Sequence, residues 1–256
     1  MQTFFTSSLD VAQVTLYGFW IFFAGLIFYL RREDKREGYP LQHEGPGRHS
    51  GIGFPAFPGM KRYLLRSGHT ATIPNWKNDR ADAPVTPMAP WPGSPYVPTG
   101  NPMLDGVGPA SYAAREDLPE LNMDNIPAIV PLRADRTIFI EARDPDPRGM
   151  PVIGADGELG GTVSEVWVDR AEMLIRYLEV EIEGSAERRV LLPMTMARVD
   201  RNRSRVHVQS VLGRQFADAP VLASPDQVTK LEEDKIVGYF GGGNLYASAA
   251  RQEPLL

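Results

Sequence analysis

The first apolar block of the chain covers residues 11–30, twenty consecutive positions without a charged side chain. At a rise of about 1.5 Å per residue, a helix of this length spans about 30 Å, the thickness of the hydrocarbon core of a bilayer. The ten residues before the block contain no Lys or Arg, and no small-x-small cleavage site follows it, which argues against a cleaved signal peptide. The pattern predicts a single transmembrane helix over 11–30.

The flank that follows this block is positively charged and holds Arg31, Arg32, Lys35 and Arg36. Before the block, Asp10 is the only charged residue. Because positively charged flanks remain on the cytoplasmic side, we expect residues 1–10 to face the periplasm and the rest of the chain to lie in the cytoplasm.

Two glycines of the apolar block, Gly18 and Gly25, are seven residues apart and share one face of the predicted helix. A face without side chains lets a partner helix approach closely, so we interpret this pair as helix-packing residues. The alternative is that glycine is simply common in membrane helices.

The next part of the chain is rich in proline, with 16 of the 23 prolines between residues 39 and 131 and no helical period longer than two turns. Such a segment has no means of building a compact core, yet it carries Trp76, Trp91 and several Tyr and Phe residues, whereas disordered segments are depleted in aromatics. We therefore predict that residues 31–131 form an extended wrap over another surface. Within it, residues 61–74 predict a β-hairpin that turns at Ser67-Gly68.

From residue 132 onward the pattern changes to short segments rich in β-branched and aromatic residues. It predicts strands over 137–142, 162–169, 173–182, 188–194 and 204–210. In the third of these, apolar side chains alternate with Tyr177, Glu179 and Glu181, which predicts one dry and one wet face. Strands of this length and spacing are typical of a small barrel or sandwich, so residues 132–256 are expected to form a mainly β domain.

A helix is predicted near the C-terminus of this domain. Ser224, Pro225 and Gln227 fit the N-cap, first and third positions of a helix, and the glycines at 241–243 fit its end. The charged run Leu-Glu-Glu-Asp-Lys at 231–235 is expected on the wet side of that helix.

Composition excludes several classes of function. The chain has no Cys, which excludes a disulfide scaffold, a zinc ribbon and thiol catalysis. Its four His residues are scattered without ligand spacing, and neither a nucleophile elbow nor a phosphate-binding loop occurs. The net charge of −5 argues against a general nucleic-acid binder. We expect no enzyme active site and no metal site.

Acidic residues gather in the predicted strands and turns of the β domain, accompanied by Arg170 and Arg176. They are Glu165, Asp169, Glu172, Glu179 and Glu181. On spacing alone, such a charge run is typical of a solvated face of the barrel.

Several short motifs nevertheless carry a family resemblance in order along the chain. They are FWIFFAGLIFYL at 19–30, REGYPL at 36–41, DGVGPASY at 105–112, DLPEL at 117–121, VSEVWVD at 163–169, RYLEVE at 176–181, LLPM at 191–194 and LEEDKIVGY at 231–239. Through them the chain resembles the H subunit of the purple-bacterial photosynthetic reaction centre over essentially its full length. Its C-terminal part resembles the PRC-barrel domain.

The resemblance implies a single-pass subunit of the bacterial inner, intracytoplasmic photosynthetic membrane that caps the cytoplasmic face of the L and M subunits. It implies that bacteriochlorophyll, bacteriopheophytin, quinones and the non-haem iron are held by those partners and not by this chain. A cytochrome subunit, light-harvesting antenna and membrane lipids are further partners that it implies.

The resemblance also implies a role for some of the acids, because the secondary quinone takes up protons beneath a protein cap. Glu172 matches the proton-relay glutamate of the family, with Asp169 and Arg176 beside it. The chain departs from some relatives after residue 121, where those relatives carry histidines that collect protons. Here Asp124 and Glu120 are the only local substitutes for a point of proton uptake.

Two functions therefore follow from the sequence. The first is a non-catalytic, proton-conducting subunit of a light-driven electron-transfer complex. The second is a membrane-tethered PRC-barrel adaptor that binds a soluble partner. The long aromatic and proline-rich segment favours the first, because it needs a large fixed surface to lie on.

Overall fold

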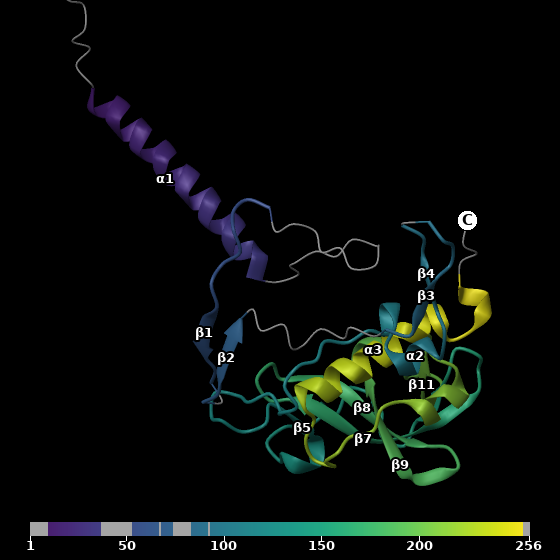
Figure 1. The fold of residues 1–256 in the computed structure, drawn as a ribbon. Coiled ribbons are helices and arrows are strands. Elements are labelled where there is room, and N and C mark those ends of the chain that lie inside the picture. The colour runs from purple at the N-terminus through teal and green to yellow at the C-terminus, as the bar shows by residue number, and fades with distance from the viewer. Residues whose placement is uncertain (1–9, 37–52, 67, 74–82, 92, 253–256) are drawn as a thin grey trace, which may run out of the picture. The chain divides into compact units, whose positions relative to one another are not determined.

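A computed structural model describes residues 10–36, 53–66, 68–73, 83–91 and 93–252 of the chain. Two compact units are present, the first within residues 1–79 and 90–94 and the second within residues 80–89 and 95–256. Figure 1 shows the helix and hairpin of the first unit and the β domain of the second.

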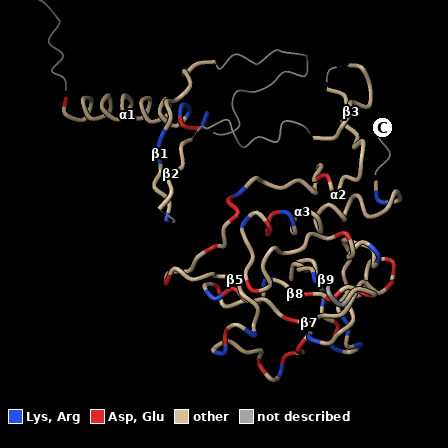
Figure 2. The backbone as a smooth tube through the Cα atoms, turned by 60° about the horizontal axis from the view of Figure 1, so that its bottom comes forward, with Lys and Arg blue, Asp and Glu red and all other residues tan. Residues whose placement is uncertain are grey.

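The first unit begins with helix α1 (Val11–Glu33). Its interior has no charge and no proline, and charged residues stand only at its two ends, as Figure 2 shows. The predicted helix is confirmed and continues three residues beyond its expected end. Among the described residues it is the one helix that is long and apolar enough to cross a membrane.

The predicted hairpin of the first unit is also confirmed. Strand β1 (Lys61–Leu64) pairs antiparallel with β2 (Thr70–Ile73), and Gly68 in the turn takes a positive φ of 81°. Ser67 lies outside the described residues. Upstream, the ammonium group of Lys35 donates to the backbone carbonyls of Gly53 and Pro55, which ties the end of α1 to the following chain.

The second unit opens with short elements that lack a core of their own. Strand β3 (Val85–Pro87) pairs with β4 (Tyr96–Pro98), and the one-turn helix α2 (Pro102–Asp105) follows. Met103 in α2 and Ala110 beyond it are buried. This part of the proline-rich segment is therefore packed in the β-domain unit, and the division at residue 131 stays a prediction.

The main sheet has seven strands in the order β10-β11-β6-β7-β8-β9, with β5 paired to β7. All neighbours are antiparallel except β11 and β6. The strands are β5 (Ile129–Pro131), β6 (Pro151–Ile153), β7 (Leu159–Asp169), β8 (Leu174–Ile182), β9 (Ser185–Pro193), β10 (Ala197–Asp200) and β11 (Arg205–Val208). Four of the five predicted strands are thereby confirmed as β7, β8, β9 and β11.

The predicted strand over 137–142 is wrong, because this stretch forms turns and irregular chain. The Asp135 carboxylate accepts hydrogen bonds from both the backbone N–H and the hydroxyl of Thr137, which turns the chain. Within this sheet the pattern missed β5, β6 and β10, which have only three or four residues.

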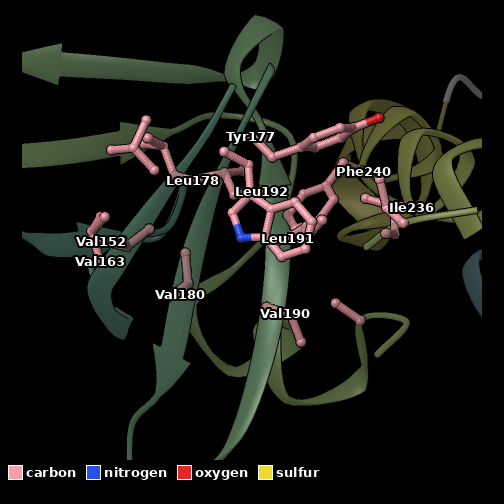
Figure 3. Packing of buried hydrophobic residues seen from close by; sticks show 14 of the residues in the cluster. Val152, Val163, Tyr177, Leu178, Val180, Val190, Leu191, Leu192, Ile236 and Phe240 are labelled. Atoms are coloured by element: carbon pink, nitrogen blue, oxygen red, sulfur yellow. The ribbon is translucent and has the colours of Figure 1, made fainter. Parts of the chain in front are cut away.

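The core lies between this sheet and the C-terminal helix. Trp167, Ile236 and Phe240 are fully buried in it, and Leu178 is fully buried on the opposite face of β8. Figure 3 shows Tyr177 of β8 extending toward the helix that carries Ile236 and Phe240. The prediction that this face of β8 is wet is therefore wrong. Tyr177 and Glu179 are buried, and Glu181 is half-buried.

The C-terminal helix α3 (Lys230–Tyr246) starts later than predicted. Thr229 is the N-cap, and its hydroxyl and the side chain of Glu232 form a reciprocal capping box. Ser224, the expected cap, instead forms an isolated bridge with Gln227. The predicted start was wrong because Thr229 and Glu232 offer a second, complete capping signature a few residues downstream.

The helix also continues through the three glycines that were expected to end it. A Cβ atom on Gly242 would lie 2.5 Å from the Cβ of Ala110, and one on Gly238 would lie 2.7 Å from the Ala110 carbonyl oxygen. These glycines therefore serve close packing of α3 against the chain around residue 110.

Candidate functional site

The predicted relay residues lie at the turn between β7 and β8. Asp169 is the last residue of β7 and is buried. Its Oδ1 atom accepts hydrogen bonds from the backbone N–H groups of Ala171 (2.8 Å) and Glu172 (3.1 Å). Met173 completes the turn at a φ of 55°. The Asp169 carboxylate thus stabilises the turn that presents Glu172.

Glu172 and Arg176 form a loose pair on the outside of this turn. The Arg176 Nη1 atom is 3.8 Å from the Glu172 Oε2 atom, and the two side chains are 41% and 59% exposed. A pair of this kind contributes about 0–1 kcal/mol to stability, so it does not lock the carboxylate in place. Glu172 is open to water.

A buried carboxyl group that the sequence analysis missed, Glu233 of α3, lies near this pair. It is 6% exposed, and its Oε2 atom accepts a hydrogen bond of 2.7 Å from the Tyr177 hydroxyl. Tyr177 follows Arg176 directly in β8, so the site combines the end of the sheet with the first turns of the helix.

Burial raises the pKa of Glu233 above its ordinary value of 4.5. The hydrogen bond from Tyr177 and the charges of Arg176 and Arg115 lower it in part, while the charge of Glu120 raises it further. Burial also raises the pKa of Tyr177, which keeps the hydroxyl protonated as a donor. A carboxyl group in this setting is able to bind and release a proton closer to neutral pH than an exposed one.

The expectation that residues 231–235 lie on the wet side of the helix is wrong for Glu233. Glu233, Ile236 and Phe240 are spaced three and four residues apart, which places them on one helix face. Because the other two are large and apolar, this spacing was the signal for a buried glutamate.

The two residues predicted as the point of proton uptake, Glu120 and Asp124, lie in an exposed segment before β5. The backbone carbonyl of Glu120 accepts from the N–H of Ala128, and the N–H of Asp124 donates to the side chain of Asn122. Glu120 acts electrostatically on Glu233. A role in proton uptake stays a prediction for both residues.

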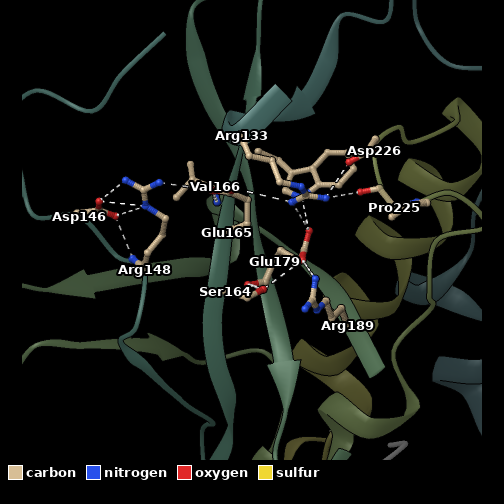
Figure 4. A network of polar contacts seen from close by, with 11 residues as sticks. Arg133, Asp146, Arg148, Ser164, Glu165, Val166, Glu179, Arg189, Pro225 and Asp226 are labelled. Carbon is tan, nitrogen blue, oxygen red and sulfur yellow. Dashed lines mark hydrogen bonds and ion pairs between the residues drawn. The ribbon is translucent and has the colours of Figure 1, made fainter. Parts of the chain in front are cut away.

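Two further acids, Glu165 and Glu179, form a separate network, which Figure 4 shows. They lie opposite each other on β7 and β8 and are 8% and 4% exposed. The Arg133 Nη1 atom is 3.5 Å from Glu179 and 3.8 Å from Glu165. Arg189 lies 3.3 Å from Glu179, and Arg148 lies 3.7 Å from Glu165.

Neutral donors complete the network. The Trp167 indole N–H donates to Glu179 at 2.9 Å, and the hydroxyl of Ser164 donates to it at 3.2 Å. The backbone N–H of Val166 donates to Glu165 at 2.9 Å. Buried carboxylates with this many partners are structural.

The interpretation of the acidic run as a solvated face is therefore wrong for Glu165, Asp169 and Glu179, which are buried. It fails because the arginines that neutralise the network, Arg133 and Arg148, come from outside the run. Of the predicted relay residues, Glu172 and Arg176 are exposed.

Gly18 and Gly25 lie in α1, where no residue is buried by the described chain. No atom of the described chain outside the helix lies within 4 Å of where a Cβ on either glycine would be. The face is thus open to a partner, and its role in helix packing stays a prediction.

No metal site is visible in the described part of the chain, because no three His, Asp or Glu side chains group as ligands there. That this chain binds no cofactor itself stays a prediction.

Comparison with protein families places the two parts of the chain. Residues 3–134 match the family described as the photosynthetic reaction centre H-chain N-terminal region. Residues 139–215, which include β6 to β11, match the PRC-barrel domain. The first match alone covers more than half of the 256 residues.

Proposed function

The chain belongs to the H-chain family of the photosynthetic reaction centre, and from this membership we propose that it caps the L and M subunits on their cytoplasmic face and conducts protons to the secondary quinone. As a reaction-centre H subunit it is a structural, membrane-associated component of the complex. The periplasmic N-terminus, the cytochrome and antenna partners and the location of pigments, quinones and iron on the partner subunits are part of the proposal.

Exposed apolar side chains support the capping role. Met173 and Leu174 at the β7–β8 turn are 68% and 41% exposed, and Met123 and Ile126 are 88% and 43% exposed. The two pairs lie at the same end of the sheet, because β5, which follows residue 126, runs antiparallel to β7 and pairs with its last residues. Such a patch suits a face that a partner covers.

Substitution of this patch tests the capping role. Met173→Asp places a charge in the proposed interface, so less of the chain should remain in the complex after detergent washing. Leu159→Asp is the matched control, because Leu159 is exposed at the opposite end of β7. Equal retention of both variants contradicts this location of the interface.

The proton-conducting role is carried by one observation, the joining of an exposed and a buried carboxyl group through Arg176. Arg176 pairs with Glu172 at the surface, and its charge lowers the pKa of the buried Glu233. A proton taken up at Glu172 has a second acceptor, with a raised pKa, in the same electrostatic cluster. A proton that crosses a cap without water needs acceptors at different depths, and these two carboxyl groups provide them.

Flash spectroscopy tests this role. Glu172→Gln removes the titrating proton while it keeps the shape of the side chain. The first electron transfer to the secondary quinone should be unchanged, and the second, which is coupled to protonation, should slow by tenfold or more, equal to about 1.4 kcal/mol in barrier height. Glu181→Gln, at a half-buried position near the end of β8, is the control. An unchanged second transfer in Glu172→Gln contradicts the proposal.

A simpler measurement separates this function from the tethered adaptor. Purification of the chain from its native membrane should bring with it the near-infrared absorption bands of bacteriochlorophyll. Purification with a soluble protein and without pigment favours the adaptor.

A further inference from the structure

The hairpin of β10 and β11 concentrates positive charge in a short stretch of the chain. Residues 198–207 hold four arginines and one aspartate, which gives a net charge of +3 with His207 neutral. The strand register places Arg198 opposite His207 and Asp200 opposite Arg205. Because these positions alternate by two along each strand, all four side chains share one face of the hairpin.

This face lines a cleft of about 640 Å³ together with Arg201 and Arg203 of the turn. The volume lies within the range of small-molecule sites, about 300–1,000 Å³. The cleft is lined by four arginines and a single acid.

The single acid does not satisfy the arginines. One oxygen of Asp200 accepts the backbone N–H groups of Asn202 and Arg203, which shapes the turn. Its other oxygen is 4.0 Å from the Nε atom of Arg203 and 3.9 Å from that of Arg205, beyond hydrogen-bond distance. The buried Nε atom of Arg205 has no acceptor among the described residues, and Arg198 and Arg201 form no ion pair with any of them.

Three arginines elsewhere in the domain differ from those of the cleft. Arg148 lies 2.6 Å from Asp146, Arg170 lies 2.7 Å from Asp135, and Arg133 lies 2.9 Å from Asp226. Those guanidinium groups already bind carboxylates of the chain. The donors of the hairpin cleft, in contrast, are left for an anion from outside.

We propose that the cleft of the β10–β11 hairpin binds a phosphate group, carried either by a soluble phosphorylated compound or by the headgroup of an anionic phospholipid. Guanidinium groups donate paired hydrogen bonds to phosphate oxygens, and several arginines around one concave site match the multiple oxygens and charge of a phosphate. This site is independent of Glu172 and Glu233 and does not depend on the proton-conducting role.

Binding is tested by titration calorimetry on the purified complex that contains the full chain, at low ionic strength. The probes are pyrophosphate and dihexanoyl phosphatidylglycerol below its micelle concentration. At least one should bind saturably at one site per chain, and Arg198→Gln/Arg201→Gln should weaken that binding by tenfold or more. Arg136→Gln/Arg143→Gln removes the same charge from exposed positions outside the cleft and should leave binding unchanged.

The pattern among the probes identifies the source of the phosphate. Binding of pyrophosphate alone indicates a soluble ligand, and binding of the lipid in competition with pyrophosphate indicates a headgroup. The proposal is overturned if neither probe binds saturably or if both double variants weaken binding equally. It is also overturned if a polyglutamate peptide binds at the hairpin and neither phosphate probe does, since that marks a carboxylate partner. Circular dichroism of each variant confirms that the β domain is intact.

Discussion

The pair Glu165 and Glu179 and the single residue Glu233 are buried carboxyl groups over the same face of β7 and β8, and they have different partners. Glu165 and Glu179 are held by arginines and by neutral donors (Figure 4). Glu233, which meets the neighbouring Tyr177, has one neutral hydrogen-bond donor and a raised pKa. The pair is held in place by several charged and neutral partners, whereas Glu233, which meets a single hydroxyl group and has a raised pKa, is able to change its protonation state.

The largest loss of stability is expected when the network around Glu165 and Glu179 loses an arginine. Arg133→Met removes the cation that lies between Glu165 and Glu179, so two buried carboxylates lose a shared partner. The free energy of unfolding should fall by about 2–4 kcal/mol. Denaturant unfolding of the full chain in detergent, followed by near-ultraviolet circular dichroism, measures this. Arg136→Met, at an exposed position, should be nearly neutral, and an equal loss in both variants would refute the structural role of the network.

Glu233 is a residue of α3, so the position of this helix over the sheet determines where its carboxyl group lies. Gly242→Ala should force α3 away from Ala110 and cost about 1–3 kcal/mol, as overpacking does. Gly241→Ala is the matched control, because its Cβ would lie 3.4 Å from the Pro109 carbonyl oxygen, an ordinary contact. That variant should be neutral or stabilising through helix propensity. If both variants behave alike, close packing does not explain the glycines.

A smaller effect is expected at the contact that orients Glu233. Tyr177→Phe removes the hydroxyl donor and leaves a buried carboxyl group without its partner, at a cost of about 1–2 kcal/mol. Because that hydrogen bond lowers the pKa of Glu233, its loss should raise this pKa further. The titration of Glu233, followed by infrared absorption of the protonated carboxyl group in both proteins, reports the shift. A downward shift is incompatible with the assigned contact.

The smallest effect is a dependence of stability on pH. The folded-state pKa of Glu233 lies above its unfolded value near 4.5, so the folded chain binds this proton more tightly. The resulting stabilisation is complete below pH 4.5 and is lost as the pH rises through the folded pKa. Unfolding between pH 4 and 8 should therefore show that the wild type loses stability relative to Glu233→Gln as the pH rises. A constant difference would mean that Glu233 does not titrate in this range.

Strand periodicity and the apolar block were sufficient to predict α1, the hairpin of β1 and β2 and four strands of the sheet. The partners of the acids were beyond such patterns. Arg133 is more than thirty residues before Glu165, and only the pairing of β5 with β7 brings this part of the chain to the network. The wet face of β8 was mispredicted for a similar reason, because alternation shows that two faces differ but not that a helix covers the polar one.

The candidate site was predictable only in part. Glu172 and Arg176 are neighbours through the local turn, which spacing anticipates, whereas Glu233 joins them through tertiary packing. Its helix-face spacing with Ile236 was visible in the sequence but was outweighed by the charged run around it.

The most direct test of the account is proton uptake on reduction of the secondary quinone, measured with pH-indicator dyes in complexes that carry Glu233→Gln or Glu179→Gln, each normalised to pigment content. If Glu233 exchanges protons and Glu179 has a structural role only, uptake near neutral pH should be smaller or slower in Glu233→Gln and unchanged in Glu179→Gln. Normal uptake in Glu233→Gln together with reduced uptake in Glu179→Gln would contradict the account.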